Sequence, residues 1–148
     1  RSLIRAQVSH IEAVCYLIRR MLLSLPKDIL ISEFSHAGRL KLDDKRINKS
    51  DNAEVTNRMG TKDNIDFSFK SFAKIFTKDF QLIKGTAWEN FLVVLDARDR
   101  LTHPKSFDSQ IISPSEWESL EKTDEWFTSE TNRMLNQAKK ENQFMAQP

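Results

Sequence analysis

The stretch "SLIRAQVSHIEAVCYLIRRMLLSL", residues 2–25, determines the fold class expected for this chain. Its apolar residues recur at steps of three and four, which places them on one face of an α-helix. This face comprises Leu3, Ile4, Val8, Ile11, Val14, Cys15, Ile18, Met21, Leu22 and Leu25. Pro26 ends the pattern because a proline inside a helix removes a backbone hydrogen bond and clashes with the preceding turn. The pattern predicts a long amphipathic helix.

Two further segments have helical periodicity. Residues 27–38 predict a shorter second helix. Residues 65–83, "IDFSFKSFAKIFTKDFQLI", place aromatic and aliphatic side chains on one helical stripe, which predicts a core-facing helix rather than an exposed stacking surface for bases. The stripe comprises Phe69, Phe72, Phe76, Phe80 and Ile83, with Phe67 and Ile75 at its edges.

The last two predicted helices begin with capping boxes, in which an N-cap side chain and a glutamate three residues later satisfy each other's backbone amides. In "TAWE", residues 86–89, Thr86 is the expected N-cap and Glu89 its partner. In "SPSE", residues 113–116, Ser113 is the N-cap, Pro114 the first helical residue and Glu116 the partner. The inner face expected for the last helix is Trp117, Leu120, Phe127, Met134, Leu135 and Ala138.

The intervening residues 39–64 lose this periodicity and are rich in Asn, Asp, Lys and Arg, so they predict a long mobile loop. The chain has 148 residues with only 3 Gly and 4 Pro, a composition that favours long helices over a many-stranded fold. We therefore expect one domain, residues 1–148, folded as an all-α, four- to five-helix up-and-down bundle.

Composition argues against several functional classes. The net charge of +2 is too small to indicate a nucleic-acid partner by itself. Cys15, the single cysteine, lies on the apolar helix face, so we expect core packing and a reducing, cytoplasmic location. Arg19 and Arg20 interrupt the most apolar run, so no membrane span is expected. The three histidines are scattered without carboxylates at ligand spacing, and we expect no metal or other cofactor.

Candidate chemistry lies in "DARDRLTHPK", residues 96–105. At about 100° per residue, the apolar stripe that begins at Trp88 runs directly into Asp99, and His103 lies four residues further on the same face. Arg98 is about 140° around the helix from His103, so one straight helix does not bring them together. Either the helix unwinds before Pro104, or a second copy of the helix contributes.

The segment "RDRLTH", residues 98–103, resembles the Arg-polar-x-x-x-His signature of HEPN domains, in which the polar residue is usually Asn or Asp. A second Arg-x4-His, "RAQVSH" at residues 5–10, has Ala6 at the polar position and lies inside the first helix, so we interpret it as a chance match. The resemblance implies a small helical bundle that dimerises and that cleaves RNA without a metal. It also implies a toxin or phage-defence role, with an antitoxin or regulatory protein as a partner.

The resemblance further implies transesterification by the ribose 2′-OH. In that reaction His103 moves the proton, Arg98 neutralises charge on the phosphorane and Asp99 orients His103. Three basic residues are expected to hold flanking phosphates: Arg100, Lys105 and Lys84. The alternative is a non-catalytic helical HEPN-like module that binds a protein or a nucleotide.

Overall fold

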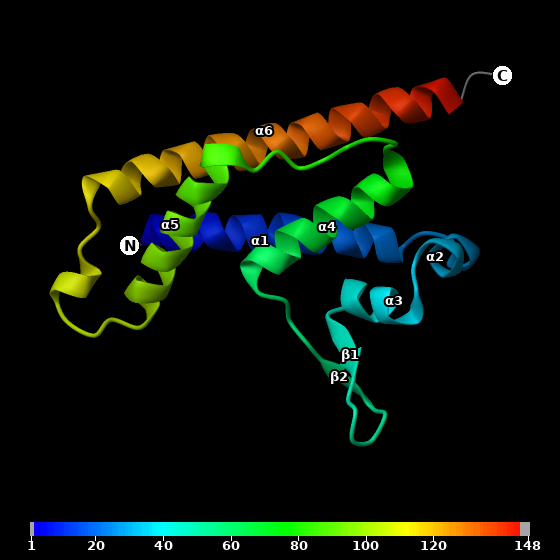
Figure 1. Ribbon diagram of the computed structural model, residues 1–148, viewed down its shortest axis with the longest axis horizontal. Helices are drawn as coiled ribbons and strands as arrows, with labels where there is room; N and C mark the ends of the chain where they lie inside the picture. The colour runs from blue at the N-terminus through cyan, green and yellow to red at the C-terminus, as the bar shows by residue number, and fades with distance from the viewer. Residues whose placement is uncertain (1, 146–148) are drawn as a thin grey trace. The chain divides into compact units, whose positions relative to one another are not determined.

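The computed structural model describes residues 2–145 and is predominantly helical (Figure 1). The helical class is confirmed, with one α-helix more than expected among the described residues and with an unexpected pair of strands. The elements are α1 (Ser2–Leu23), α2 (Lys27–Glu33), α3 (His36–Leu42), β1 (Lys45–Ile47), β2 (Glu54–Thr56), α4 (Thr61–Phe76), α5 (Gly85–Thr102), the 3-10 helix η1 (Asp108–Gln110) and α6 (Pro114–Met145).

The chain divides into two compact units where the sequence predicts one domain. The first unit takes the described residues up to Ile11 together with Leu82–Asn136. The second takes Glu12–Gln81 and the described residues from Gln137 onward. The division therefore falls inside α1 and inside α6, the two longest helices.

Aromatic side chains of α5 and α6 form the core of the first unit. Trp126 packs edge-on against Trp88, with ring centroids 5.7 Å apart, and its indole Nε1 donates a 2.6 Å hydrogen bond to the backbone oxygen of Ile83. Phe91 and Phe127 are fully buried beside it. The hydrogen bond satisfies the indole N–H, which is the only polar group of the buried Trp126 ring. The ring contacts determine how α5 packs on α6.

The inner face predicted for α6 is partly confirmed. Leu120, Phe127, Met134 and Ala138 are buried, but Trp117 and Leu135 are 40% and 46% exposed. The pattern instead continues through Thr123, Trp126 and Glu130, all of which are buried. Because two of these three are polar, an apolar period alone does not identify them.

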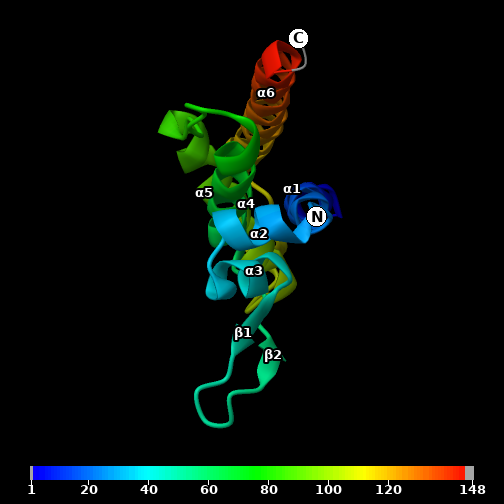
Figure 2. The ribbon, with the colours of Figure 1, turned by 90° about the vertical axis from the view of Figure 1, so that its right-hand side faces the viewer.

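The region predicted as one short helix and a long loop forms regular structure in the second unit. Phe34 is extended, and Ser35 caps a separate helix, α3, by accepting a 3.1 Å hydrogen bond from the amide of Gly38. Residues 45–56 form an antiparallel hairpin that pairs Lys45 with Thr56 and projects beyond α3 in both views (Figures 1 and 2). The prediction of an irregular segment at 39–64 is therefore wrong, because three-residue strands are too short to show a period of two.

The aromatic helix α4 is shorter than predicted. It ends at Phe76, and Thr77 is extended with φ −139° and ψ 147°. Phe80 still reaches the core from this extended segment, with its ring centroid 6.3 Å from that of Phe69, whereas Ile83 is 61% exposed. The amide of Lys78 donates a 2.7 Å hydrogen bond to the Glu141 carboxylate, a partner from α6 that replaces the helical one.

Cys15 lies in the core of the second unit, as predicted. It is fully buried on α1, and its backbone oxygen accepts a 3.3 Å hydrogen bond from the Ser68 hydroxyl of α4. Burial raises the pKa of the Cys15 thiol to about 12. The thiol is therefore protonated at neutral pH and serves as core packing rather than as a nucleophile.

The start of α5 differs from the predicted capping box. The helix begins at Gly85, which has φ +47°, and Lys84 occupies the capping position without a side-chain hydrogen bond that caps the helix. Thr86 consequently lies inside the first turn, where it cannot serve as the N-cap. Glycine is the residue that adopts positive φ at little cost, so it allows the chain to turn into the helix two residues early.

Candidate active site at the end of helix α5

The final residues of α5 present the predicted catalytic set to solvent. Thr102 is the last helical residue, and His103 leaves the helix with φ −125° and ψ 64° while its amide still donates a 3.0 Å hydrogen bond to the Asp99 backbone oxygen. Pro104 disfavours helical geometry at His103, so the unwinding expected from the sequence is confirmed. The His103 imidazole is exposed.

Asp99 contacts Arg98 and not His103. Asp99 Oδ1 lies 2.8 Å from Arg98 Nε. The Nε–H bond does not point at this oxygen, so the contact is an ion pair and not a hydrogen bond. The structure has no hydrogen bond between the Asp99 and His103 side chains, although both residues are described. The orienting role predicted for Asp99 is therefore replaced by a contact that positions Arg98.

Arg100 stabilises the connection that follows α5. Its guanidinium donates hydrogen bonds to the backbone oxygens of Ser109 and Ile111, the latter at 2.9 Å, and it pairs with Glu116 at the start of α6. These partners compensate its charge and occupy its donors. Arg100 therefore holds the loop between α5 and α6, and the substrate-binding role predicted for it stays a prediction.

Glu116 anchors this same connection through the predicted capping box, which is confirmed. The Ser113 amide donates to the Glu116 carboxylate at 2.7 Å, and the Glu116 amide donates to Ser113 Oγ at 3.2 Å. Burial acts to raise the pKa of Glu116, but hydrogen bonds from the Ser113 amide and from Arg100 outweigh it and hold the pKa below its usual value.

Glu116→Gln is expected to destabilise the fold by about 1 kcal/mol at pH 7, as for the loss of a capping interaction. Because the pKa of Glu116 is lowered on folding, this contribution is complete above its unfolded-state value of about 4.3 and is lost as pH falls through the folded-state pKa. Urea unfolding at pH 7 and at pH 3 measures it. Glu118→Gln, on the exposed neighbouring turn, is the control and should change stability little. An equal deficit for Glu116→Gln at both pH values contradicts the assignment.

His103 and Lys105 share a surface hollow of about 460 Å³. Asp99, Arg100 and Ser109 complete its lining, so every wall comes from the end of α5 and the loop after it. Arg98 is not among the lining residues. Within one copy of the chain, the structure therefore unites His103 with Lys105 but leaves Arg98 beside the hollow, held by Asp99.

Lys84 does not belong to this site. It precedes α5, and 18 helical residues separate it from His103, a length of about 27 Å. Its Nζ atom lies 4.1 Å from the centroid of the Trp88 ring, where it forms a cation–π contact. Lys84 and His103 lie at opposite ends of α5, so within one copy Lys84 is not brought to the hollow, and its predicted contact with flanking phosphates stays a prediction.

Arg5 is a member of the site that the sequence did not identify. Its Nη2 atom donates a hydrogen bond to the Leu101 backbone oxygen, one of the carbonyls left unpaired at the end of α5. The motif "RAQVSH" thus contributes its arginine to the helix end, whereas His10 packs edge-on against Phe127. Arg5 lies on the exposed face of α1, and only its tertiary contact distinguishes it from other surface arginines.

No helix in the part of the chain that the structure describes is long and apolar enough to cross a membrane. Within residues 2–145, no group of three or more His, Cys, Asp or Glu side chains is arranged to hold a metal ion. Comparison with protein-family models, with curated proteins and with solved structures finds no match.

Proposed function

We propose that the end of α5 is an RNA-cleaving site that acts by 2′-OH transesterification, in a HEPN-like manner. The observation that carries the proposal is the placement of His103. It is exposed at a helix end, next to Lys105 in a hollow. Arg98 lies on the last turn of the same helix, and Arg5 of α1 donates to the Leu101 backbone oxygen there. An imidazole among fixed cations suits proton transfer beside a phosphodiester.

In the proposed reaction the ribose 2′-oxygen attacks the adjacent phosphorus, and the bond from phosphorus to the 5′-oxygen breaks. The 2′-OH proton passes to a base and a proton passes to the leaving 5′-oxygen, which yields a 2′,3′-cyclic phosphate and a 5′-OH. His103 takes one of these proton-transfer roles. Arg98 neutralises charge on the phosphorane through its planar fork of donors, and Lys105 binds a flanking phosphate.

A homodimer completes the site in this proposal. Arg98 does not line the hollow of its own His103, so in this proposal the Arg98 that acts with that histidine comes from a second copy. Two copies related by a two-fold axis at this helix end place two histidines and two Arg98 residues around one cleft. The same surface would also receive an antitoxin or regulatory protein, and cytoplasmic RNA is the expected substrate.

A non-catalytic module is the second candidate, and one observation favours it. Arg98 is paired with Asp99 and Arg100 with Glu116, so two of the basic groups at the helix end are already compensated. A surface with so little uncompensated charge suits a protein partner as well as a polyanion.

The test is incubation of an end-labelled RNA with the protein in excess chelator, followed by mass spectrometry of the products. Cyclic phosphate and 5′-OH termini are expected, with no cleavage at a position that carries a 2′-deoxyribose. His103→Ala is the test variant, and His36→Ala, purified in parallel, is its control, because His36 is an exposed histidine on α3 in the other unit. Equal cleavage by His103→Ala would remove His103 from the mechanism and contradict a site at the end of α5. No cleavage by wild type would favour the binding module.

A further inference from the structure

A cavity of about 340 Å³ lies in the second unit, and none of its lining residues belongs to the α5 site. Its lining comes from one face of α1, from the turn after α3, from the segment between β2 and α4, and from the first turn of α4. The lining residues are Glu12, Tyr16, Arg19, Asp44, Arg58, Met59 and Asn64. The volume is near the lower end of the range for ligand pockets, about 300–1,000 Å³, which suits a small metabolite.

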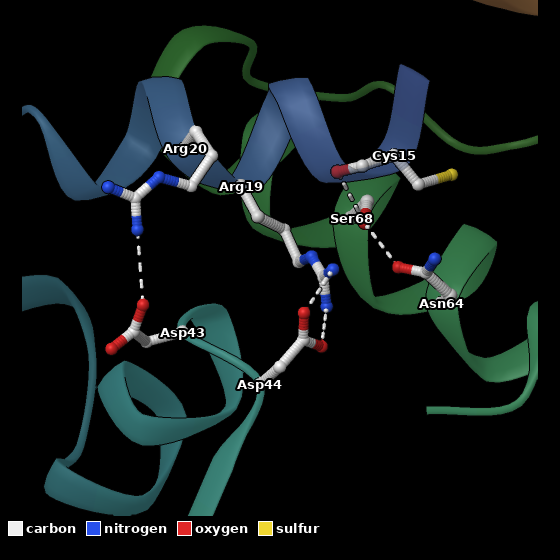
Figure 3. Close-up of polar contacts among 7 residues, drawn as sticks. All are labelled: Cys15, Arg19, Arg20, Asp43, Asp44, Asn64 and Ser68. Atoms are coloured by element: carbon white, nitrogen blue, oxygen red, sulfur yellow. Dashed lines mark hydrogen bonds and ion pairs between the residues drawn. The ribbon is translucent and has the colours of Figure 1, made fainter. Parts of the chain in front are cut away.

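A self-compensated ion pair, Arg19 with Asp44, contributes one part of this lining (Figure 3). The Arg19 side chain is only 3% exposed, and its Nη atoms donate to both Asp44 oxygens at 2.6 and 3.0 Å. The charges of the two residues cancel. Arg19 Nε is buried without a hydrogen-bond partner, so the pair keeps a donor on the side of the guanidinium that Asp44 does not occupy.

The remaining charged groups are one carboxylate and one guanidinium. Glu12 accepts a 2.6 Å hydrogen bond from Thr61 Oγ1 through one oxygen, which leaves the other oxygen for a donor. Arg58 is exposed and has no ion pair or hydrogen bond among the described residues. It precedes Gly60, which caps α4 without a side-chain acceptor, so the first amides of that helix also lack intrahelical partners.

Asn64 and two less polar side chains complete the surface. Asn64 is 7% exposed, and its Oδ1 atom accepts a 3.3 Å hydrogen bond from Ser68, so its amide nitrogen is the group left to donate. Tyr16 is 49% exposed, and Met59 is half-buried. The cavity therefore presents an acceptor at Glu12, donors at Asn64 and Arg58, and an aromatic ring with a thioether.

We propose that this cavity binds a free α-amino acid as its zwitterion. Arg58, with the uncapped start of α4, receives the carboxylate; Glu12 receives the ammonium; Tyr16 and Met59 contact the side chain. A zwitterion carries one charge of each sign, so its carboxylate pairs with Arg58, its ammonium pairs with Glu12, and no charge in the cavity is left without a partner. A phosphate or a simple carboxylate would place an uncompensated anion beside Glu12, which is costly once the groups lose water. This inference does not depend on RNA cleavage at α5.

Isothermal titration of the whole chain with each of the proteinogenic L-amino acids tests the proposal. At least one is expected to bind at a single site and to shift the side-chain amide signal of Asn64 in NMR spectra. For that amino acid, the C-terminal amide and the N-acetyl derivative should each bind about tenfold more weakly or worse, since each removes a charge-assisted hydrogen bond. Inorganic phosphate is titrated as a separate arm.

Two variants assign the binding to the cavity. Glu12→Gln keeps an acceptor for Thr61, and Arg58→Gln alters an exposed side chain, so both are expected to fold and each should weaken binding about tenfold or more. Arg46→Gln and Glu54→Gln, exposed on the hairpin outside the cavity, are the controls and should bind as wild type does. The proposal is overturned if no amino acid binds at millimolar concentration, if the N-acetyl derivative binds equally, or if phosphate binds and Glu12→Gln does not weaken the amino acid.

Discussion

Asp44→Asn is expected to lower the free energy of unfolding by about 3 kcal/mol. The substitution leaves the Arg19 guanidinium, 3% exposed, without its counter-charge, and breaking a buried pair by removing one partner costs about 3–5 kcal/mol. We place the effect at the lower end because the Asp44 side chain is 25% exposed, so water can partly replace the carboxylate. Asparagine has nearly the same size and also tolerates the φ of +53° at this position, so backbone strain does not contribute.

The adjacent ion pair supplies the control. Asp43→Asn removes the partner of two exposed cations, Arg20 at 3.1 Å (Figure 3) and Lys45 at 2.8 Å. The Arg20, Lys45 and Asp43 side chains are 51%, 41% and 36% exposed. Exposed pairs contribute about 0–1 kcal/mol, so this variant should differ from wild type by less than 1 kcal/mol. Urea unfolding of both variants at pH 7 measures the contrast. Equal losses for Asp43→Asn and Asp44→Asn would show that burial of Arg19 does not govern stability here.

The parts of the fold that follow from local sequence were predictable. The apolar period of α1 and the Ser113–Glu116 capping box involve residues within one helix or one turn. The capping box is confirmed, and the period is confirmed except at Leu3 and Met21, which are 55% and 40% exposed. The end of α4 was not predictable. The backbone amide of Lys78 donates to the Glu141 carboxylate instead of to a helical carbonyl, and Glu141 lies 63 residues further along the chain. The hairpin was missed for another reason: its stability comes from pairing and from contact with α3, not from a recognisable strand pattern.

The candidate site shows the same division. Pro104 acts on its neighbour, so the unwinding at His103 could be predicted from the sequence. The partner of Arg100 could not, because Glu116 follows a loop whose path the sequence does not specify. Asp99 illustrates a choice between two local partners: the sequence placed His103 and Arg98 within its reach, and the structure selects Arg98. Arg5 belongs to "RAQVSH", which we interpreted from the sequence as a chance match. Its contact with Leu101 forms only when the chain folds, so the sequence does not reveal it.

His103→Ala is expected to reduce the initial rate of RNA cleavage by about 10²- to 10⁴-fold, the range for loss of a general acid or base. Arg98→Ala is expected to reduce it by about 10²- to 10³-fold, as for loss of one group that stabilises transition-state charge. His103 is exposed and Arg98 is 30% exposed, so neither variant should lower the melting temperature appreciably. Wild-type activity in either variant would remove that residue from the proposed mechanism.

Mixing the two inactive variants determines whether the site is shared between copies. Arg98 does not line the hollow of its own His103, so we expect the Arg98 of one copy to act with the His103 of another. A mixed dimer then holds one intact pair, the arginine from the His103→Ala copy and the histidine from the Arg98→Ala copy, and should regain cleavage that neither variant has alone. Light scattering at micromolar concentration should report a dimer. Mixed dimers that form and stay inactive would contradict a site shared between copies. A monomer would eliminate the shared cleft, since no second Arg98 could then reach His103.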